Sequence, residues 1–219
     1  MYIQISTNIY PLTEQQIRDM YPHVSFPHFF EPPEDFALVK QSVQPDYNPN
    51  TQMVVERVPV LREGSYYQQW EIVELSNEVI DQNLSIRRSD IWNQIKSIRD
   101  SKLIQGFKCN GYWFHSDINS KILYLVNKDT ARDYELDEEI LRDPGSDDAI
   151  EWKTMDNKFV TLTKRLAYDI IKELKFFERQ IFLNAEKLKS EVYLSENPTS
   201  LDINIGWPET YQDHVDNNS

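Results

Sequence analysis

Hydrophobic positions change their period along the chain. Residues 51–61 and 66–75 are rich in Val, Ile, Tyr and Trp, which predicts two strands joined by a hairpin loop at 62–65. Phe36 to Val43 is a further strand candidate. From residue 77 to 105 apolar residues recur at spacings of four, seven, four and three, which predicts one helix with a single apolar stripe. The stripe consists of Ile80, Leu84, Ile91, Ile95 and Ile98.

Eight of the eleven prolines lie before residue 60, so long helices are not expected there. A short helix from Thr13 to Met20 fits, with Thr13 as its cap and Pro22 beyond its end. The proline-rich arm that follows carries Phe26, Phe29 and Phe30, which we expect to lie on a surface. These three residues, Trp70 and the helical stripe are the candidate interaction residues.

The second half begins with the strongest local signal. Asn110-Gly111 separates residues 107–109 from 112–114, which predicts a hairpin with a two-residue type I′ turn. Residues 121–127 are expected to add a third strand, and residues 152–160 a second hairpin. Thr163 is then expected to cap a helix reaching Leu194, because apolar residues recur every three or four positions. An extended segment at 203–207 should pack back on the fold.

These elements predict an α+β protein. We divide it into a proline-rich arm and small antiparallel β domain (1–75), a connecting helix (76–105) and a domain of β-hairpins with one long helix (106–211). Residues 129–151 are interpreted as an acidic insertion, and residues 212–219 as a frayed polar tail.

Charge limits the choice of partners. The 219 residues carry a formal net charge of −13, which argues against nucleic-acid binding. Residues 129–151 hold ten acidic residues against two arginines, so this segment supplies most of that charge. No apolar run is long enough to cross a membrane, and no secretory leader is seen at Met1. With 40% hydrophobic and 12% aromatic residues, the chain is too apolar to be disordered.

Candidate chemistry is sparse. The single cysteine, Cys109, cannot form an internal disulfide and suits a reducing cytoplasm. A low-pKa nucleophile is conceivable there, but a half-buried strand residue fits better. No phosphate-binding loop or cofactor motif is found, so no cofactor is expected.

His115-Ser116-Asp117 is the only compact trio of reactive residue types. It could belong to a metal or hydrolytic site. The structural interpretation is stronger, because Asp and Asn side chains after a strand form turns. Asp117 and Ser120 would then cap a turn while His115 bonds nearby backbone. The structural turn residues are Asn110, Gly111, His115, Asp117 and Ser120.

Several separated motifs then occur in a recognisable order. Gly111-Tyr-Trp-Phe-His-Ser-Asp117 with Ser120 follows Arg99-Asp100, and Trp152-Lys-Thr154 and Gly206-Trp-Pro208 come later. Over roughly residues 90–211 the chain resembles a family of unknown function associated with tails and tail fibres of tailed bacteriophages. The acidic segment 129–151 is longer than expected for that family.

The resemblance implies a non-enzymatic virion protein that connects or decorates tail, baseplate or tail fibre. Its partners would be other tail or tail-fibre proteins, and it would be made in the host bacterial cytoplasm and end in the virion tail. A tail-fibre assembly chaperone is the alternative, and a metal-dependent hydrolase using His115 and Asp117 is a remote one. The stripe from Ile80 to Ile98 could be a homo-oligomer seam or an internal core face, with the core face favoured.

Overall fold

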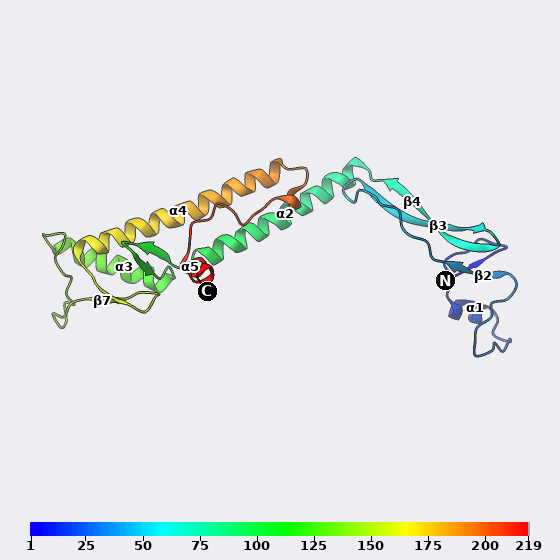
Figure 1. Cartoon of the computed structure of the whole chain (residues 1–219), viewed down its shortest axis with the longest axis horizontal. Coiled ribbons are helices and arrows are strands. Elements are labelled where there is room, and N and C mark those ends of the chain that lie inside the picture. Colours follow the sequence, from blue (N-terminus) through cyan, green and yellow to red (C-terminus); the bar gives the residue numbers. More distant parts are fainter. Residues whose placement is uncertain (219) are drawn as a thin grey trace. The chain divides into compact units, whose positions relative to one another are not determined.

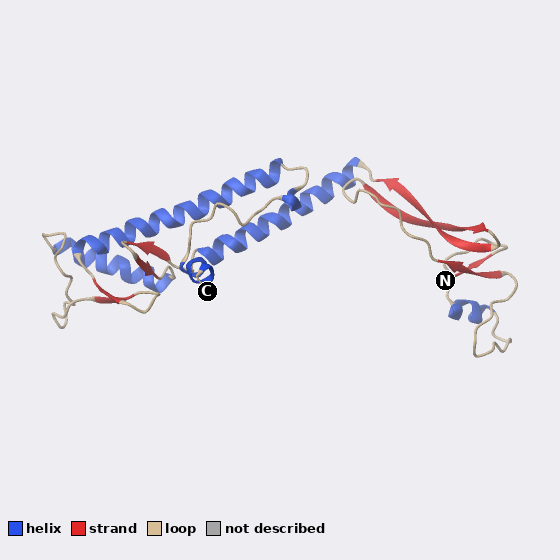
Figure 2. Cartoon of the chain, viewed as in Figure 1, coloured by secondary structure: helices blue, strands red, loops and turns tan. Residues whose placement is uncertain are grey.

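A computed structural model describes residues 1–218 and confirms the α+β class. The chain forms two compact units, one from Met1 to Asn83 and one from Leu84 onward. The division falls within helix α2 (Asn77–Lys102), so the helix expected to connect two domains contributes to both units. Figure 1 follows the chain in sequence order, and Figure 2 separates helices from strands.

The N-terminal unit is built on a four-stranded sheet. Its strands are β1 (Tyr2–Gln4), β2 (Phe36–Lys40), β3 (Gln52–Arg62) and β4 (Ser65–Glu74), in the order β1-β2-β4-β3. Two pairings are antiparallel as expected, but β2 runs parallel to β4. Strand β4 folds back antiparallel to β3 and lies between β3 and β2, so that it runs in the same direction as β2.

Local chemistry explains the β3–β4 hairpin. Glu63 and Gly64 form its turn, and both have positive φ, as a two-residue hairpin turn requires. The register shifts between Arg57 and Val60, on either side of Pro59. Proline cannot donate to a ladder and is accepted at edge strands or bulges, and β3 is an edge strand.

The proline-rich arm is ordered around helix α1 (Glu14–Met20). Thr13 caps this helix as expected, and Gln16 completes a capping box. Ile17 of α1 is buried with Leu12 and Phe36. The arm therefore packs on its own small core.

The C-terminal unit is arranged on two helices. Helix α4 (Lys164–Leu194) packs against α2 at one end and against α3 (Ile118–Thr130) and two hairpins at the other, as Figure 1 shows. The hairpins pair β5 (Phe107–Cys109) with β6 (Tyr112–Phe114), and β7 (Glu151–Lys153) with β8 (Phe159–Thr161). Two 3-10 turns, η1 (Ala131–Asp133) and η2 (Pro198–Ser200), and helix α5 (Tyr211–Asn217) complete the unit.

Helix α4 matches its prediction. Thr163 accepts a hydrogen bond from the Leu166 amide at 3.2 Å, and the helix ends at Leu194. Its apolar stripe is shared by two core clusters, one with the hairpins and α3 and one with Ile91 and Ile95 of α2. Trp207, in the segment expected to pack back, contacts both clusters.

The strand expected at 121–127 is wrong, because this segment lies in helix α3. The run from Ile122 to Val126 is apolar without a clear period, and such runs suit either a buried strand or a helix. Asp117 favours the helix over the strand. Its carboxylate accepts the amides of Asn119 and Ser120 at 3.0 and 3.1 Å, which begins a helix there.

The acidic segment 129–151 is more than a solvated loop. Its first residues end α3 and form η1, and Ala131 and Leu141 are fully buried. Leu141 donates to the Leu162 carbonyl at 2.8 Å and accepts from the Ile150 amide at 2.8 Å. The acidic side chains stay outside while these apolar residues hold the segment to the core.

The polar tail expected at 212–219 is also wrong over the described residues, because Tyr211–Asn217 form α5; Ser219 lies outside them. Thr210 caps α5 and Asp213 completes a capping box. The polar composition of this segment does not indicate a helix, because α5 is stabilised by capping and by contacts with distant residues.

Gly106 lies between α2 and β5 in a left-handed backbone conformation that residues with a side chain rarely adopt. Its φ is +87°, and a Cβ atom there would lie 2.1 Å from Met155 Sδ and 3.0 Å from the Phe114 carbonyl oxygen. We expect Gly106→Ala to destabilise the C-terminal unit by about 2–4 kcal/mol, because left-handed strain adds to overpacking. Urea unfolding followed by circular dichroism measures the change.

Gly111→Ala is the matched control. Gly111 has the same φ of +87° with nothing within 4 Å of the added atom, so this variant isolates the strain, about 1–2 kcal/mol. Equal losses for the two variants would show that packing around Gly106 contributes nothing.

Candidate functional site

The reactive trio supports the backbone. Ser116 is fully buried, and its Oγ accepts the Gly106 amide at 2.9 Å. Asp117 caps α3 and also accepts the Ser120 hydroxyl at 2.6 Å, and these hydrogen bonds hold the pKa of its carboxyl below the usual value. The His115 carbonyl accepts Tyr124 Oη at 2.9 Å. Within residues 1–218 the His115 ring has no hydrogen-bond partner, so its expected bond to backbone is not found.

Cys109 is a core residue of β5. It is buried with Phe107 and Phe114, and burial raises the pKa of its thiol to about 12, with Asp169 and Glu173 adding to the effect. The thiolate is the reactive form of cysteine, and it is not populated near neutral pH at such a pKa. The nucleophile interpretation therefore has no support.

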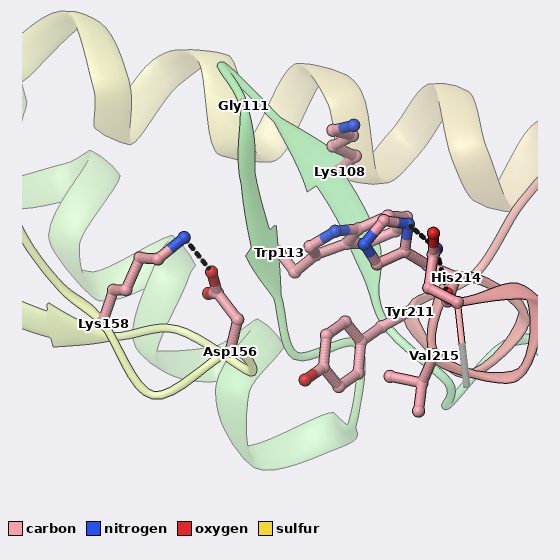
Figure 3. A pocket seen from close by; sticks show the side chains of 9 residues that line it. Lys108, Gly111, Trp113, Asp156, Lys158, Tyr211, His214 and Val215 are labelled. Atoms are coloured by element: carbon pink, nitrogen blue, oxygen red, sulfur yellow. Dashed lines mark hydrogen bonds and ion pairs between the residues drawn. The ribbon is translucent and has the colours of Figure 1, made fainter.

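A surface cleft of about 430 Å³ lies beside the first hairpin, shown in Figure 3. One wall is aromatic. Trp113 of β6 contacts the His214 ring at 5.2 Å and the Tyr211 ring at 5.8 Å between centroids, and Lys108 Nζ lies 5.4 Å from the Trp113 ring centroid. The complete lining is Lys108, Gly111, Trp113, Asp156, Lys158, Tyr211, His214, Val215 and Asn218.

The opposite wall is an ion pair on the turn of the second hairpin. Lys158 Nζ lies 2.6 Å from Asp156 Oδ2, and Asp156 also accepts the Thr154 hydroxyl at 2.7 Å. These hydrogen bonds hold the pKa of the Asp156 carboxyl below its usual value. The cleft thus offers an aromatic side and a charged side, which suits binding of a mixed polar and apolar group.

Helix α5 closes the aromatic wall because distant residues hold it. Lys102 donates to both oxygens of Asp213, at 2.8 and 2.7 Å, and the Tyr211 amide donates to the Gln105 carbonyl at 3.1 Å. Burial raises the pKa of Asp213, but the hydrogen bonds from Lys102 and Thr210 outweigh it, so the pKa is lowered overall.

The candidate interaction residues of the N-terminal unit are not brought to one place. Phe26 and Phe30 are half-buried against each other, with the Arg18 guanidinium within 5.2 Å of both ring centroids. Phe29 is 85% exposed. Trp70 is half-buried on β4 and donates to the Ser42 carbonyl at 3.3 Å.

The apolar stripe of α2 is buried over only part of its length. Ile91 and Ile95 are buried against Ala185 and Leu188 of α4, so this part is an internal core face. The other three stripe residues are half-buried: Ile80, Leu84 and Ile98.

Asn110 and Gly111 form the first hairpin turn, with φ of +48° and +87°. Sequence reasoning located this turn but missed the cleft beside it. The missed signal was Thr210 followed by Asp213, a capping-box spacing in the supposed tail.

The described residues therefore define an α+β protein whose C-terminal unit carries a shallow cleft of mixed polarity. Within residues 1–218 no three His, Cys, Asp or Glu side chains gather as potential metal ligands, and no helix has the length and apolarity of a membrane span.

The chain belongs to the family described as a domain of unknown function (DUF4376), whose family model matches residues 86–205, more than half of the chain. That description names no activity or partner. Neither a curated protein nor a solved structure matches the chain. The match begins inside α2 and ends before Gly206, so the α5 wall of the cleft lies beyond it.

Asp117 provides a test of the structural interpretation of the trio. We expect Asp117→Ala to cost about 1 kcal/mol at pH 7, because the α3 cap is lost, and Asp117→Asn to cost less, because asparagine also caps. The folded pKa of Asp117 is lowered, so its ionic contribution is present above about pH 4 and is lost as pH falls through that lowered pKa.

Urea unfolding of the three proteins between pH 7 and pH 2.5 measures both effects. The wild type should converge on Asp117→Asn at the acid end. A constant difference between them across this range would contradict the assigned role.

The Lys102–Asp213 pair provides a second test. We expect Asp213→Asn to loosen α5, costing about 1 kcal/mol, because the ion pair is lost and the capping box is weakened. Hydrogen exchange of amides 211–217 should accelerate while α4 stays protected. Asp216→Asn, on the same helix without a lysine partner among the described residues, is the control.

Proposed function

We propose that the chain is a non-enzymatic component of a bacteriophage tail that acts through protein–protein contacts. It would be made in the host cytoplasm and connect or decorate tail, baseplate or fibre. The motif resemblance between residues 90 and 211 supports the phage assignment. The observation that carries the non-enzymatic part is the use of the reactive trio, since Ser116 and Asp117 both hold backbone in place.

The other motif residues serve the scaffold in the same way. Trp152 packs on Tyr124 at 4.6 Å between ring centroids. Gly206 lies against Asn184, where a Cβ would come within 2.4 Å of Oδ1, and Trp207 donates to the Ile203 carbonyl at 2.9 Å. These motif residues stabilise the fold, and a component that acts by binding needs a stable surface.

Exposed apolar surface supports a binding role. Phe29 of the arm and several aliphatic residues of α3 lie in solvent, although soluble monomers rarely expose contiguous apolar patches. Such surfaces are typical of chains that are covered by partners in an assembly.

Mass spectrometry of purified virions tests the proposal. In particles of a phage that encodes this chain, we expect the protein at a fixed ratio to known tail proteins. Tailless heads from the same phage should lack it, and an abundant host protein serves as the contamination control. Absence from complete virions would contradict the proposal, and insolubility of the fibre without this chain would then favour the assembly chaperone.

A further inference from the structure

The packed pair of α2 and α4 has two long sides, and the rest of the unit covers them unequally. Residues 201–207 return along one side, where the Asn184 amide donates to the Ile205 carbonyl at 2.9 Å (Figure 1). Lys189 comes five residues after Asn184 on α4, so it projects about 140° away around the helix axis. It therefore lies on the opposite side of the pair, away from the returning segment.

Aromatic rings and cations meet on that second side. Trp92 of α2 has Lys189 Nζ at 4.8 Å and Lys96 Nζ at 5.8 Å from its ring centroid. Phe182 of α4 has the guanidinium carbon of Arg99 at 5.5 Å from its ring centroid. Because contacts of this kind hold long side chains in place, these cations are preorganised for a ligand.

Arg88 extends this surface by one helical turn. It falls with the three α2 residues above within a sector of about 80° around the helix axis. Its Nη2 donates to the Ser195 carbonyl at 2.9 Å, which fixes the guanidinium beside the end of α4. We call the following residues the basic surface: Arg88, Trp92, Lys96, Arg99, Phe182 and Lys189.

The basic surface carries an excess of positive charge. Asp100 lies 2.7 Å from Arg99 and Glu186 lies 3.4 Å from Lys189, and both acidic side chains are more than 60% exposed. The hydrogen bond from Arg99, with a smaller effect from Lys96, holds the pKa of Asp100 below its usual value. Within residues 1–218 the other two cations of the surface form no ion pair. The local charge is therefore +2 on a chain of −13.

An acidic protein segment fits this surface better than a nucleic acid. Single strands bind through aromatic faces on which bases stack, and both rings here already have cations over them. The net charge of −13 also repels a long polyanion. A short acidic stretch carries few charges, and its carboxylates form strong charge-assisted hydrogen bonds with guanidinium and ammonium groups. Exposed ion pairs contribute little, so these carboxylates can exchange with the two acids already present.

The cations are spaced for an extended chain. Arg88 and Lys96 are eight residues apart on α2, a rise of about 12 Å, and Lys189 lies over Trp92 halfway between them. In an extended chain, side chains on one face repeat every two residues, or about 6.7 Å. Three acids at alternating positions would therefore face Arg88, Lys189 and Lys96 in turn.

We propose that the basic surface binds an extended segment of a partner protein in which acidic residues alternate with uncharged ones. The acidic segment of this chain does not have that form. Its backbone is bonded to the start of α4, where the Arg165 amide donates to the Asp137 carbonyl at 2.8 Å. It then turns back, because the Asp143 amide donates to the Asp148 carbonyl at 2.8 Å. The proposal rests on the protein–protein role above only in taking the partner to be a protein.

Fluorescence anisotropy with a labelled peptide tests the proposal. The probe is a peptide of about twelve residues in which Glu and Ser alternate. We expect saturable binding to the full chain that weakens as salt rises from about 50 to 500 mM, because the contacts are ionic. Lys189→Glu and Lys96→Glu should each weaken binding by about fivefold or more, since each replaces an ion pair with a repulsion.

Lys187→Glu is the matched control. Lys187 lies two residues before Lys189 on α4, pairs with Glu191 at 3.8 Å and is 69% exposed, but it projects about 160° away from the basic surface. This variant has the same net charge as Lys189→Glu and should bind within about twofold of the wild type. Circular dichroism checks folding. Lys189→Gln, which removes the charge without reversing it, should give an intermediate loss.

Failure of the wild type to bind the peptide, or equal losses for the Lys187→Glu and Lys189→Glu variants, would overturn the proposal. So would tighter binding of an oligothymidylate of equal charge, which would make the surface a nucleic-acid site. Salt-dependent self-association in the ultracentrifuge that Lys189→Glu abolishes would place a second copy on the surface instead, which also contradicts it. None of these results depends on the virion measurement, so failure here and failure of the phage assignment are distinguishable.

Discussion

The C-terminal unit depends on the apolar stripe of α4. In proteins most of the stability of a helix comes from the packing of its amphipathic face. Ten of its residues are buried, and all of them except Asn184 belong either to the α2 cluster at one end or to the cluster of hairpins and α3 at the other. Elements distant in sequence thereby become neighbours through their contacts with this helix.

Short-range chemistry made much of this fold predictable. Thr13 and Thr163 marked helix starts, and Asn110-Gly111 marked a turn, because each acts on backbone within a few residues. The strand predicted at 121–127 was wrong, because the spacing of apolar residues there does not distinguish a strand from a helix. The local signal for helix α5 is the Thr210–Asp213 capping-box spacing within a polar segment, and the contact that holds Asp213 comes from Lys102, more than a hundred residues away.

The cleft could not be predicted for the same reason. Its walls come from a hairpin, a second hairpin and a C-terminal helix, and they meet only because all three are positioned by α4 and α2. Sequence patterns identified Trp113 and Asp156 within separate motifs, yet nothing local indicates that they face each other across a cleft. By contrast, the structural interpretation of Asp117 and Ser120 needed only their immediate surroundings.

Asn184 has a consequence for how the chain reaches this state. It is a buried polar residue on α4, and its Nδ2 donates to the Ile205 carbonyl at 2.9 Å beside Gly206. A shift of the returning segment by one residue would leave that amide unpaired, at a cost of about 1–3 kcal/mol. Leu201, Ile203 and Trp207 are synthesised after α2 and α4, so the apolar residues that they cover on these two helices stay exposed until this segment has been made and has packed in its register.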